Sequence, residues 1–323
     1  MTPLAMHRIC AALLALAAAT VSAQTYPDKV IRIVVPYPPG GGADITARPI
    51  AQKLNELWGV SVVIDHRGGA SGMIGADIVA KAPPDGYTLM VSASAEVALN
   101  VALFPKMPYD PVRDFAPITL ATVTPMALVV HPSVPINSVK EYIAIARAKP
   151  GSMTFGSASA GSPHHFAGEW LKMLTKIDIV HVPYKGMAPA LNDLLGGHLP
   201  SGFATLLPAL VHVKTGKLRA LAVTTQKRAP LLPDVPALAE TLPGFDISQW
   251  NAVWAPAGTP KDVLDKLSTE ITRIVQSPDY KSRMSEQGSE AIGNSPSELA
   301  AFQKAEIDKY LKIAQQANIK VDQ

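Results

Sequence analysis

The sequence predicts an α/β protein of two domains, on three observations. Short apolar runs typical of buried strands alternate with longer stretches of helical periodicity, which is the pattern of crossover helices on a parallel sheet. The chain has 323 residues, more than one hydrophobic core usually organises. Its single cysteine excludes an internal disulfide, so packing must hold each domain together.

The first 23 residues have the features of a secretory leader. A basic start precedes an apolar run over residues 9–19, and the small residues Val21, Ser22 and Ala23 form a cleavage pattern. The apolar run is too short to span a bilayer comfortably. We expect cleavage after Ala23 and a mature periplasmic protein that is not embedded in the membrane.

A first alternating series follows the leader. Each strand-like run precedes a helical stretch, which predicts parallel strands with crossover helices. The predicted strands span residues 30–35, 60–65 and 87–92, and the helices after the first two span residues 45–58 and 73–81. The proline-rich residues 105–117 predict a loop.

A second series predicts the second domain. Its strands span residues 126–131, 153–155, 179–182 and 218–223, and its helices begin at residues 138 and 162 and cover residues 188–195. Residues 250–255 predict one further strand, after which only helices follow. Thr259 and Ser295 each precede a proline, as helix N-caps do. Because these last helices have no strands of their own, we expect them to cover the first domain.

The composition and motifs argue against several function classes. The 29 basic and 26 acidic residues nearly balance, which is unlike a nucleic-acid-binding surface. Ile45 stands where the third glycine of a dinucleotide-binding loop belongs, and no nucleotide P-loop or serine nucleophile elbow occurs. His164, His165 and Glu169 supply too few metal ligands. We therefore predict no cofactor, no metal and no nucleic-acid partner.

Loops rich in glycine and serine follow several predicted strands, at the edge where open α/β sheets bind ligands. Residues 36–44 and 156–163 each lead into a helix whose first backbone N–H groups lack partners, and such groups can bind an anion. Residues 67–72 and the serines at 92 and 94 follow two further strands. The sequence therefore suggests two half-sites that close on a small acid.

Several stretches in the same order resemble one known family. They are residues 26–44, 75–87, 109–115, 156–169, 182–186, 216–223 and 255–260. Together they cover nearly the whole mature chain, and they resemble the periplasmic solute-binding proteins of tripartite tricarboxylate transporters, the Bug or TctC-like family.

The resemblance implies a periplasmic binding protein fold of type II, a Venus flytrap with two crossing hinge strands. Domain 1 would comprise residues 24–123 and 247–323, and domain 2 residues 124–246, with the ligand cleft between them. The implied function is capture of a small organic acid without chemistry and its delivery to the membrane permease subunits of a tripartite transporter. A monomer is expected.

Position matching also carries over the expected ligand-binding residues. In domain 1 they are Tyr37, Pro39, Gly40, Gly41, Asp44, Ser71, Ser92 and Ser94, and in domain 2 Ser157, Gly161, Ser162, His165, Tyr184, Lys185 and Ser201. Lys185 would pair with a distal acid group. After Gly196 and Gly197 the family commonly has an apolar residue and an aspartate, whereas this chain continues with residues 199–202, which include Ser201. If this segment lines the distal pocket, the missing aspartate charge argues against a ligand with an ammonium group there.

Two other functions stay open at this point. Ser157, His165 and Glu169 could form a hydrolase site, because a serine and a histidine share one loop and helix start. A sensory receptor that presents its ligand to a signalling partner would have the same sequence features. The identity of the acid is not encoded in any motif.

Overall fold

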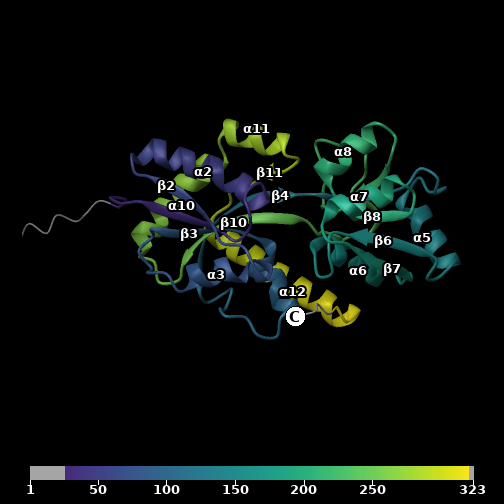
Figure 1. Ribbon diagram of the computed structural model, residues 1–323, viewed down its shortest axis with the longest axis horizontal. Coiled ribbons are helices and arrows are strands. Elements are labelled where there is room, and N and C mark those ends of the chain that lie inside the picture. Colours follow the sequence, from purple (N-terminus) through teal and green to yellow (C-terminus); the bar gives the residue numbers. More distant parts are fainter. Residues whose placement is uncertain (1–25, 320–323) are drawn as a thin grey trace, which may run out of the picture.

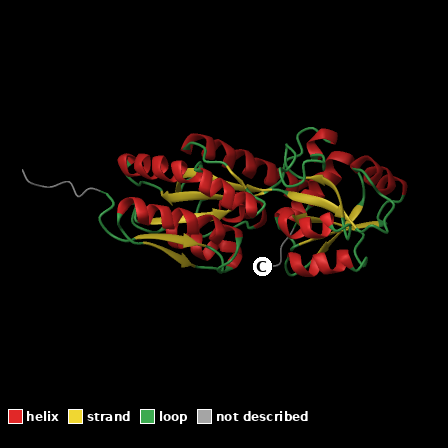
Figure 2. Cartoon of the chain, turned by 90° about the horizontal axis from the view of Figure 1, so that it is seen from above, coloured by secondary structure: helices red, strands yellow, loops and turns green. Residues whose placement is uncertain are grey.

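The computed structural model describes residues 26–319 and contains two α/β units side by side (Figures 1 and 2). One sheet has six strands in the order β11-β4-β10-β3-β1-β2, and the other has five in the order β7-β6-β8-β5-β9. The predicted α/β class is confirmed. The expected leader lies outside the described residues.

The six-stranded sheet combines both ends of the described chain. β1, β2 and β3 run parallel, whereas β10 pairs antiparallel with β3 and β4. Its strands are β1 (Ile31–Val35), β2 (Val62–His66), β3 (Thr88–Ala93), β4 (Phe115–Thr124), β10 (Gln249–Pro256) and β11 (Glu290–Ala291). Its helices are α2 (Gly42–Trp58), α3 (Met73–Ala80), α4 (Asn100–Leu103), α10 (Lys261–Val275), α11 (Pro278–Glu286) and α12 (Pro296–Ala317), with the short turns η1 (Ala70–Gly72) and η2 (Ala95–Leu99).

The five-stranded sheet is formed by the middle of the chain. β6 runs parallel to β7 and β8, and β5 pairs antiparallel with β8 and β9. Its strands are β5 (Met126–Val130), β6 (Met153–Ser157), β7 (Ile179–Pro183), β8 (Ser201–Thr205) and β9 (Arg219–Val223). Its helices are α5 (Val139–Ala148), α6 (Pro163–Thr175), α7 (Met187–Leu195), α8 (Leu206–Lys214) and α9 (Leu238–Thr241).

The sequence pattern misses two central strands, β4 and β8. β4 contains Pro117, which argues against a central strand, but Pro117 lies opposite Trp254 where the register with β10 is already irregular. β8 has only five residues, of which Ser201, Gly202 and Ala204 are small, and it gives little strand signal. A β-carbon at Gly202 would stand 3.3 Å from the Gly156 carbonyl oxygen, so close approach to β6 requires a small residue there.

Two neighbouring segments connect the sheets. β4 continues into β5 through Pro125, and residues 246–248 lead back into β10. The Thr224 hydroxyl accepts a hydrogen bond from the Met126 amide at 3.1 Å, and the Thr224 carbonyl accepts one from the Ile247 amide at 3.1 Å. We propose that these two hydrogen-bonded segments are the hinges. The domain boundaries would then fall after residues 123 and 246, as the sequence predicts.

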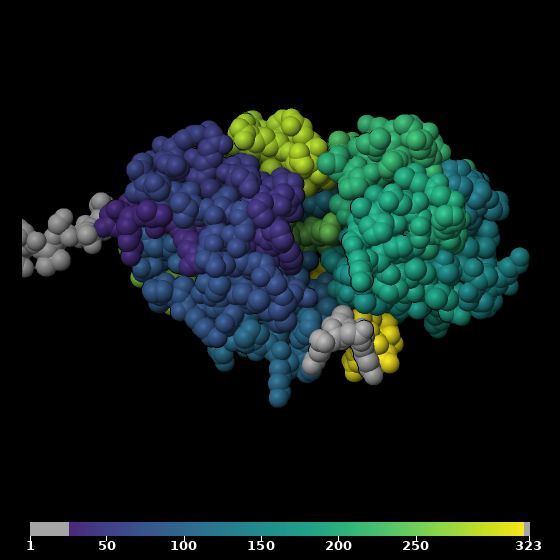
Figure 3. Space-filling view, viewed as in Figure 1, coloured from purple at the N-terminus to yellow at the C-terminus, as the bar shows by residue number. Residues whose placement is uncertain are grey.

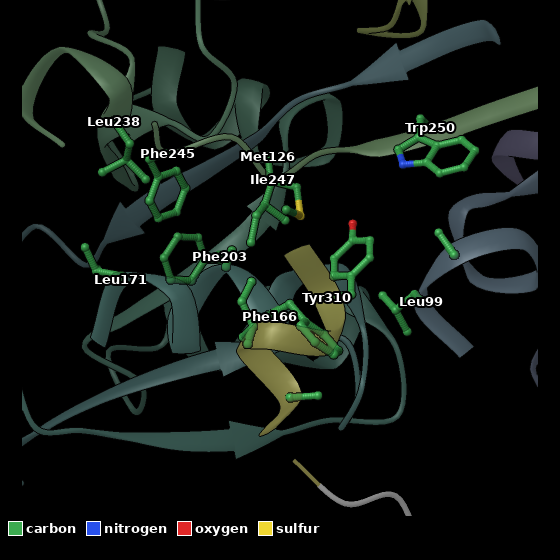
Figure 4. Packing of buried hydrophobic residues seen from close by; sticks show 14 of the residues in the cluster. Leu99, Met126, Phe166, Leu171, Phe203, Leu238, Phe245, Ile247, Trp250 and Tyr310 are labelled. Carbon is green, nitrogen blue, oxygen red and sulfur yellow. The ribbon is translucent and has the colours of Figure 1, made fainter. Parts of the chain in front are cut away.

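Helix α12 packs on both halves of the molecule. It contacts α4 and β4 on one side and α6 on the other. Figure 4 shows Tyr310 of α12 between Phe166 of α6 and Trp250 of β10, with the Tyr310 and Phe166 ring centroids 5.1 Å apart. The Trp250 indole N–H also donates to Glu306 at 2.9 Å. The expectation that the last helices cover the first domain is correct for α10 and α11 but incomplete for α12.

Gly168 of α6 offers a test of this packing. A β-carbon there would stand 2.0 Å from the ring of Phe155, which is fully buried against Phe203. Alanine normally stabilises a helix interior by about 1 kcal/mol relative to glycine. We nevertheless expect Gly168→Ala to lower the free energy of unfolding by about 1–3 kcal/mol, because overpacking outweighs propensity. Urea denaturation measures it. Gly42→Ala, which meets only Asn251 at 3.5 Å, is the control and should show no loss.

Candidate functional site

The carboxyl ends of the parallel strands in both sheets meet at the start of β10. The Thr205 hydroxyl, at the end of β8, donates to the side chain of Gln249 at 3.1 Å. Two residues after Gln249, the side-chain amide of Asn251 donates to the backbone carbonyl of Ser92, near the end of β3, at 3.1 Å. Figure 3 shows a groove between the purple-blue and teal-green halves, with a green segment at its floor. The topology therefore brings to one groove the two sheet edges at which open α/β sheets bind ligands.

Asp44 fixes the first glycine-rich loop. Its side chain is 1% exposed and accepts hydrogen bonds from the Gly40 amide and the Arg48 Nε, both at 2.8 Å, on one oxygen. The other oxygen lies 2.8 Å from the His66 Nε2. Asp44 therefore serves as the inner support of the loop, and its charge already has partners within the chain. His66 is a site residue that the sequence reasoning missed; its position at the end of β2 was the available signal.

The protonation of Asp44 follows from these contacts. Burial alone raises the pKa of a carboxyl group, but the hydrogen bonds from Gly40, Arg48 and His66 outweigh burial and lower the pKa of Asp44 below its ordinary value of 3.8. The carboxylate is thus charged at neutral pH.

The start of α2 lies at the groove edge of the first half. Gly41 is the N-cap residue, and within the described chain no side chain caps this helix. Tyr37 is half-buried and Pro39 and Gly40 are exposed in the loop before it. The uncapped amides that the sequence predicts are therefore present at this helix start.

The three predicted serines of the first half differ in their surroundings. Ser92 is fully buried, and its hydroxyl accepts from the Trp254 indole at 2.8 Å, so we leave it out of the proposed ligand contacts. Ser94 is 3% exposed at the start of η2. Ser71 is exposed, and its carbonyl accepts from the Asn100 side chain at 3.0 Å.

The second half-site is the loop before α6. Ser162 caps the helix by accepting from the His165 amide at 3.4 Å, and it donates to the Ser159 carbonyl at 2.7 Å. Gly161 has a φ of +70°, a left-handed conformation that favours glycine. Its amide donates to the His165 Nδ1 at 3.1 Å. Loop and helix start are therefore held as one unit.

Two histidines stack beneath this loop. The His165 and His181 rings lie 3.6 Å apart and nearly parallel, and the Ser157 hydroxyl lies 2.7 Å from the His181 Nε2. Burial lowers the pKa of His165 to about 3, with the neighbouring His181 as a smaller cause, and burial lowers the pKa of His181 to about 4. Both rings are neutral at physiological pH, so the second half-site offers neutral donors.

The remaining predicted residues of the second half separate into two places. The Tyr184 hydroxyl, at the carboxyl end of β7, donates to Asp193 at 2.6 Å, and the neighbouring Lys185 is exposed. Ser201 pairs with Val130 at the far end of β8, whereas Thr205 pairs with Met126 beside the hinge. Ser201 is therefore distant from the groove.

The expectation for Ser201 needs correction. Its hydroxyl is buried, donates to the Thr154 carbonyl at 2.6 Å and pairs with the Tyr142 hydroxyl at 2.9 Å. We leave it out of the proposed site. The departure at residues 199–202 then carries no information about the distal end of a ligand.

Other site types find little support in the described part of the chain. Residues 26–319 contain no group of three or more histidine, cysteine, aspartate or glutamate side chains arranged to hold a metal ion. Among the helices that the structure describes, none has the length and apolar character needed to cross a bilayer.

Comparisons with known proteins agree with this geometry. Residues 46–319 match the model of the tripartite tricarboxylate transporter family receptor. Protein BugT of Bordetella pertussis is 36% identical over 306 residues, which are 94% of this chain and 94% of BugT.

Two solved structures from Rhodopseudomonas palustris share the fold. Rpa4515, solved with adipate, is 37% identical with a TM-score of 0.78 and covers 92% of this chain and 100% of its own. MatC, solved with bound malate, is 30% identical with a TM-score of 0.72. The match covers 89% of this chain and 99% of MatC. The family resemblance inferred from the sequence is confirmed.

Asp44→Asn tests the inner support of the first loop. Asparagine can still accept from Gly40 but has no charge for Arg48 and His66, so we expect a loss of about 1–3 kcal/mol of stability at pH 7. The pKa of Asp44 is lowered in the folded state, so the stabilisation is present above the unfolded value and lost as the pH falls through the folded-state pKa.

Urea denaturation at pH 7 and at pH 3 measures this difference, which should shrink at the lower pH. Asp308→Asn, at an exposed position of α12, is the matched control. Equal stability of Asp44→Asn and the unmodified chain at pH 7 would contradict the assignment.

Proposed function

This chain belongs to the tripartite tricarboxylate transporter receptor family, and from that premise we propose that it captures a small organic acid in the groove between its two domains. The observation that carries the proposal is the meeting of two strand-end loop clusters at Gln249 and Asn251. Relatives solved with adipate and malate support a dicarboxylate of four to six carbons as the ligand class.

Neutral donors provide the proposed binding chemistry. A carboxylate loses its hydration when two domains close over it, and this is costly unless several donors replace the water. The amides at the start of α2, near Gly41, are suited to that role because no side chain caps them and they carry partial positive charge. The start of α6 adds the positive end of its helix dipole, although Ser162 already caps the His165 amide there. Ser94 and Tyr184 would complete the polar lining.

Capture without chemistry is part of the proposal. A hydrolase would need Ser157 to pass its proton to His165, but the Ser157 hydroxyl donates to the Ser159 carbonyl at 2.9 Å and contacts His181 instead. The His165 Nδ1 is occupied by the Gly161 amide. Moreover, Ser157 is fully buried, which leaves no path for an ester carbonyl to reach it.

The remaining elements of the proposal concern location and partners. We propose that the mature chain acts in the periplasm as a monomer and delivers its closed, ligand-bound form to the permease subunits of a tripartite transporter. Closure requires that the ligand bind the closed state more tightly than the open one. A signalling protein that recognises the same closed form is the alternative partner.

The first test is a thermal-shift screen of organic acids. We expect adipate, malate or a related dicarboxylate to raise the melting temperature, since a ligand at 100 times its dissociation constant adds about 2.7 kcal/mol of stability. The diamides of the same acids are the matched controls and should have no effect. Stabilisation by sugars or diamines, with none by acids, would overturn the ligand class.

Lys185→Met tests the distal end of the site. Lys185 is exposed beside Tyr184, so its ammonium group is available to a second carboxylate. We expect the variant to bind a dicarboxylate about 2- to 5-fold more weakly, in keeping with a loss of about 0.5–1 kcal/mol for one exposed ion pair, and to bind the matching monocarboxylate unchanged. Isothermal titration calorimetry measures both. Lys176→Met, remote at the end of α6, is the control; equal losses for both acids would contradict the pairing.

A further inference from the structure

Glu96 is a buried acid in the first half of the groove that the site described above does not use. It is fully buried in η2, the π-helical turn that follows β3. Its Oε2 accepts from the Ala93 amide at 2.9 Å, and among residues 26–319 its Oε1 has no hydrogen-bond partner of normal geometry. A buried carboxyl group with one such oxygen needs an explanation.

The contacts of Glu96 reach all three loops of the first half-site. Ala93 ends β3, and its amide holds one carboxyl oxygen. A β-carbon at Gly72, in the loop after β2, would lie only 1.8 Å from the Glu96 Oε1, so that loop packs directly on the carboxyl group. The hydroxyl of Tyr37, in the loop after β1, lies within hydrogen-bonding reach of the same carboxyl group. Burial and the Glu96 charge raise the pKa of Tyr37.

In the described part of the chain, no positive charge lies beside Glu96. The titratable groups that face it are the hydroxyls of Tyr37 and Tyr109, and within residues 26–319 no lysine, arginine or histidine forms an ion pair with it. From α12, the neutral Gln303 donates to the carbonyl of Val97 in the same turn. Burial raises the pKa of Glu96 to about 7, while the Tyr37 hydroxyl and the Ala93 amide lower it.

We propose that Glu96 is the positioning residue of the first half-site and that it binds one proton more firmly when an organic acid is captured. This inference rests on the proposed function. When Glu96 is protonated, its Oε1 can donate a hydrogen bond, and the side chain places no negative charge beneath the organic anion that binds. The carboxylate would repel the anion across the loops that touch both, so capture and protonation favour each other.

The proposal predicts proton-linked binding. Because the anion favours the protonated form, affinity for adipate is highest at low pH and falls as the pH rises through the ligand-free pKa of about 7. Adipate is fully ionised across pH 6.5 to 8.5, so its own titration does not interfere. We expect roughly a fivefold weakening over that range, by linkage with a bound-state pKa about one unit higher.

Glu96→Gln separates positioning from charge. Glutamine keeps an oxygen for the Ala93 amide and is always neutral, as the protonated acid is. The variant should bind adipate with the affinity of the unmodified chain at pH 6.5, unchanged up to pH 8.5. Calorimetry in two buffers of different ionisation enthalpy should show proton uptake for the unmodified chain at pH 7.5 and little for the variant. Glu56→Gln, at an exposed position of α2, is the matched control and should retain the pH dependence.

A ligand-free measurement tests the buried acid by itself. The pKa of Glu96 is raised in the folded state, so its contribution to stability is full below the unfolded value of 4.5 and lost as the pH rises through about 7. The melting temperature of Glu96→Gln, relative to that of the unmodified chain, should therefore be higher at pH 8 than at pH 5.

The outcomes are distinct. If the unmodified chain binds neither adipate nor malate at any pH, the proposed capture of such acids is wrong and the role of Glu96 in it falls too. If it binds them with the same pH dependence as Glu96→Gln, acid capture stands and the Glu96 proposal is overturned. A melting difference that does not change with pH would also overturn it.

Discussion

Both sheets direct the carboxyl ends of their parallel strands at the first residues of β10, and the candidate site depends on this constraint. Strand ends in an open α/β sheet leave loops and helix starts with unpaired amides. One such edge gives a shallow surface. Here two such edges meet within three residues of β10, at Gln249 and Asn251. Each half of the molecule therefore forms one wall of the groove, and the segment that crosses between the halves forms its floor.

The electrostatics of the groove follow from what lies behind the loops. Asp44 is charged, but Arg48 forms an ion pair with it and His66 hydrogen-bonds to it, so it stabilises the first loop with its charge compensated within the chain. The stacked His165 and His181 are neutral because burial opposes their protonation. The groups that support the two helix starts therefore add no net charge to the groove, and Lys185 is the exposed cation beside them.

Much of this organisation could be predicted from the sequence. The alternation of strands and helices predicts the two sheets, and the glycine-rich loops before α2 and α6 predict the half-sites, because both depend on short-range patterns. The status of individual side chains depends on contacts between distant residues. Asp44 stands where a ligand-binding residue was expected, yet its partner His66 comes from the next strand. Ser201 stands in a loop-like sequence but starts a central strand, in which the backbone at Gly202 approaches β6 closely.

The same long-range packing limits how the two halves can move. Tyr310 of α12 lies against Phe166 of α6, and Gly288 after α11 lies so close to Leu207 of α8 that a β-carbon would stand 3.1 Å from the leucine Cβ. In Figure 1, α11 and α8 lie above the crossing strands and α12 lies below them. A twist of one half against the other would break at least one of these contacts. The apolar surface exposed in this way would cost about 25 cal/mol of free energy per Å². A bend about the line between them preserves both, so the fold favours closure of the groove over rotation of its walls past each other.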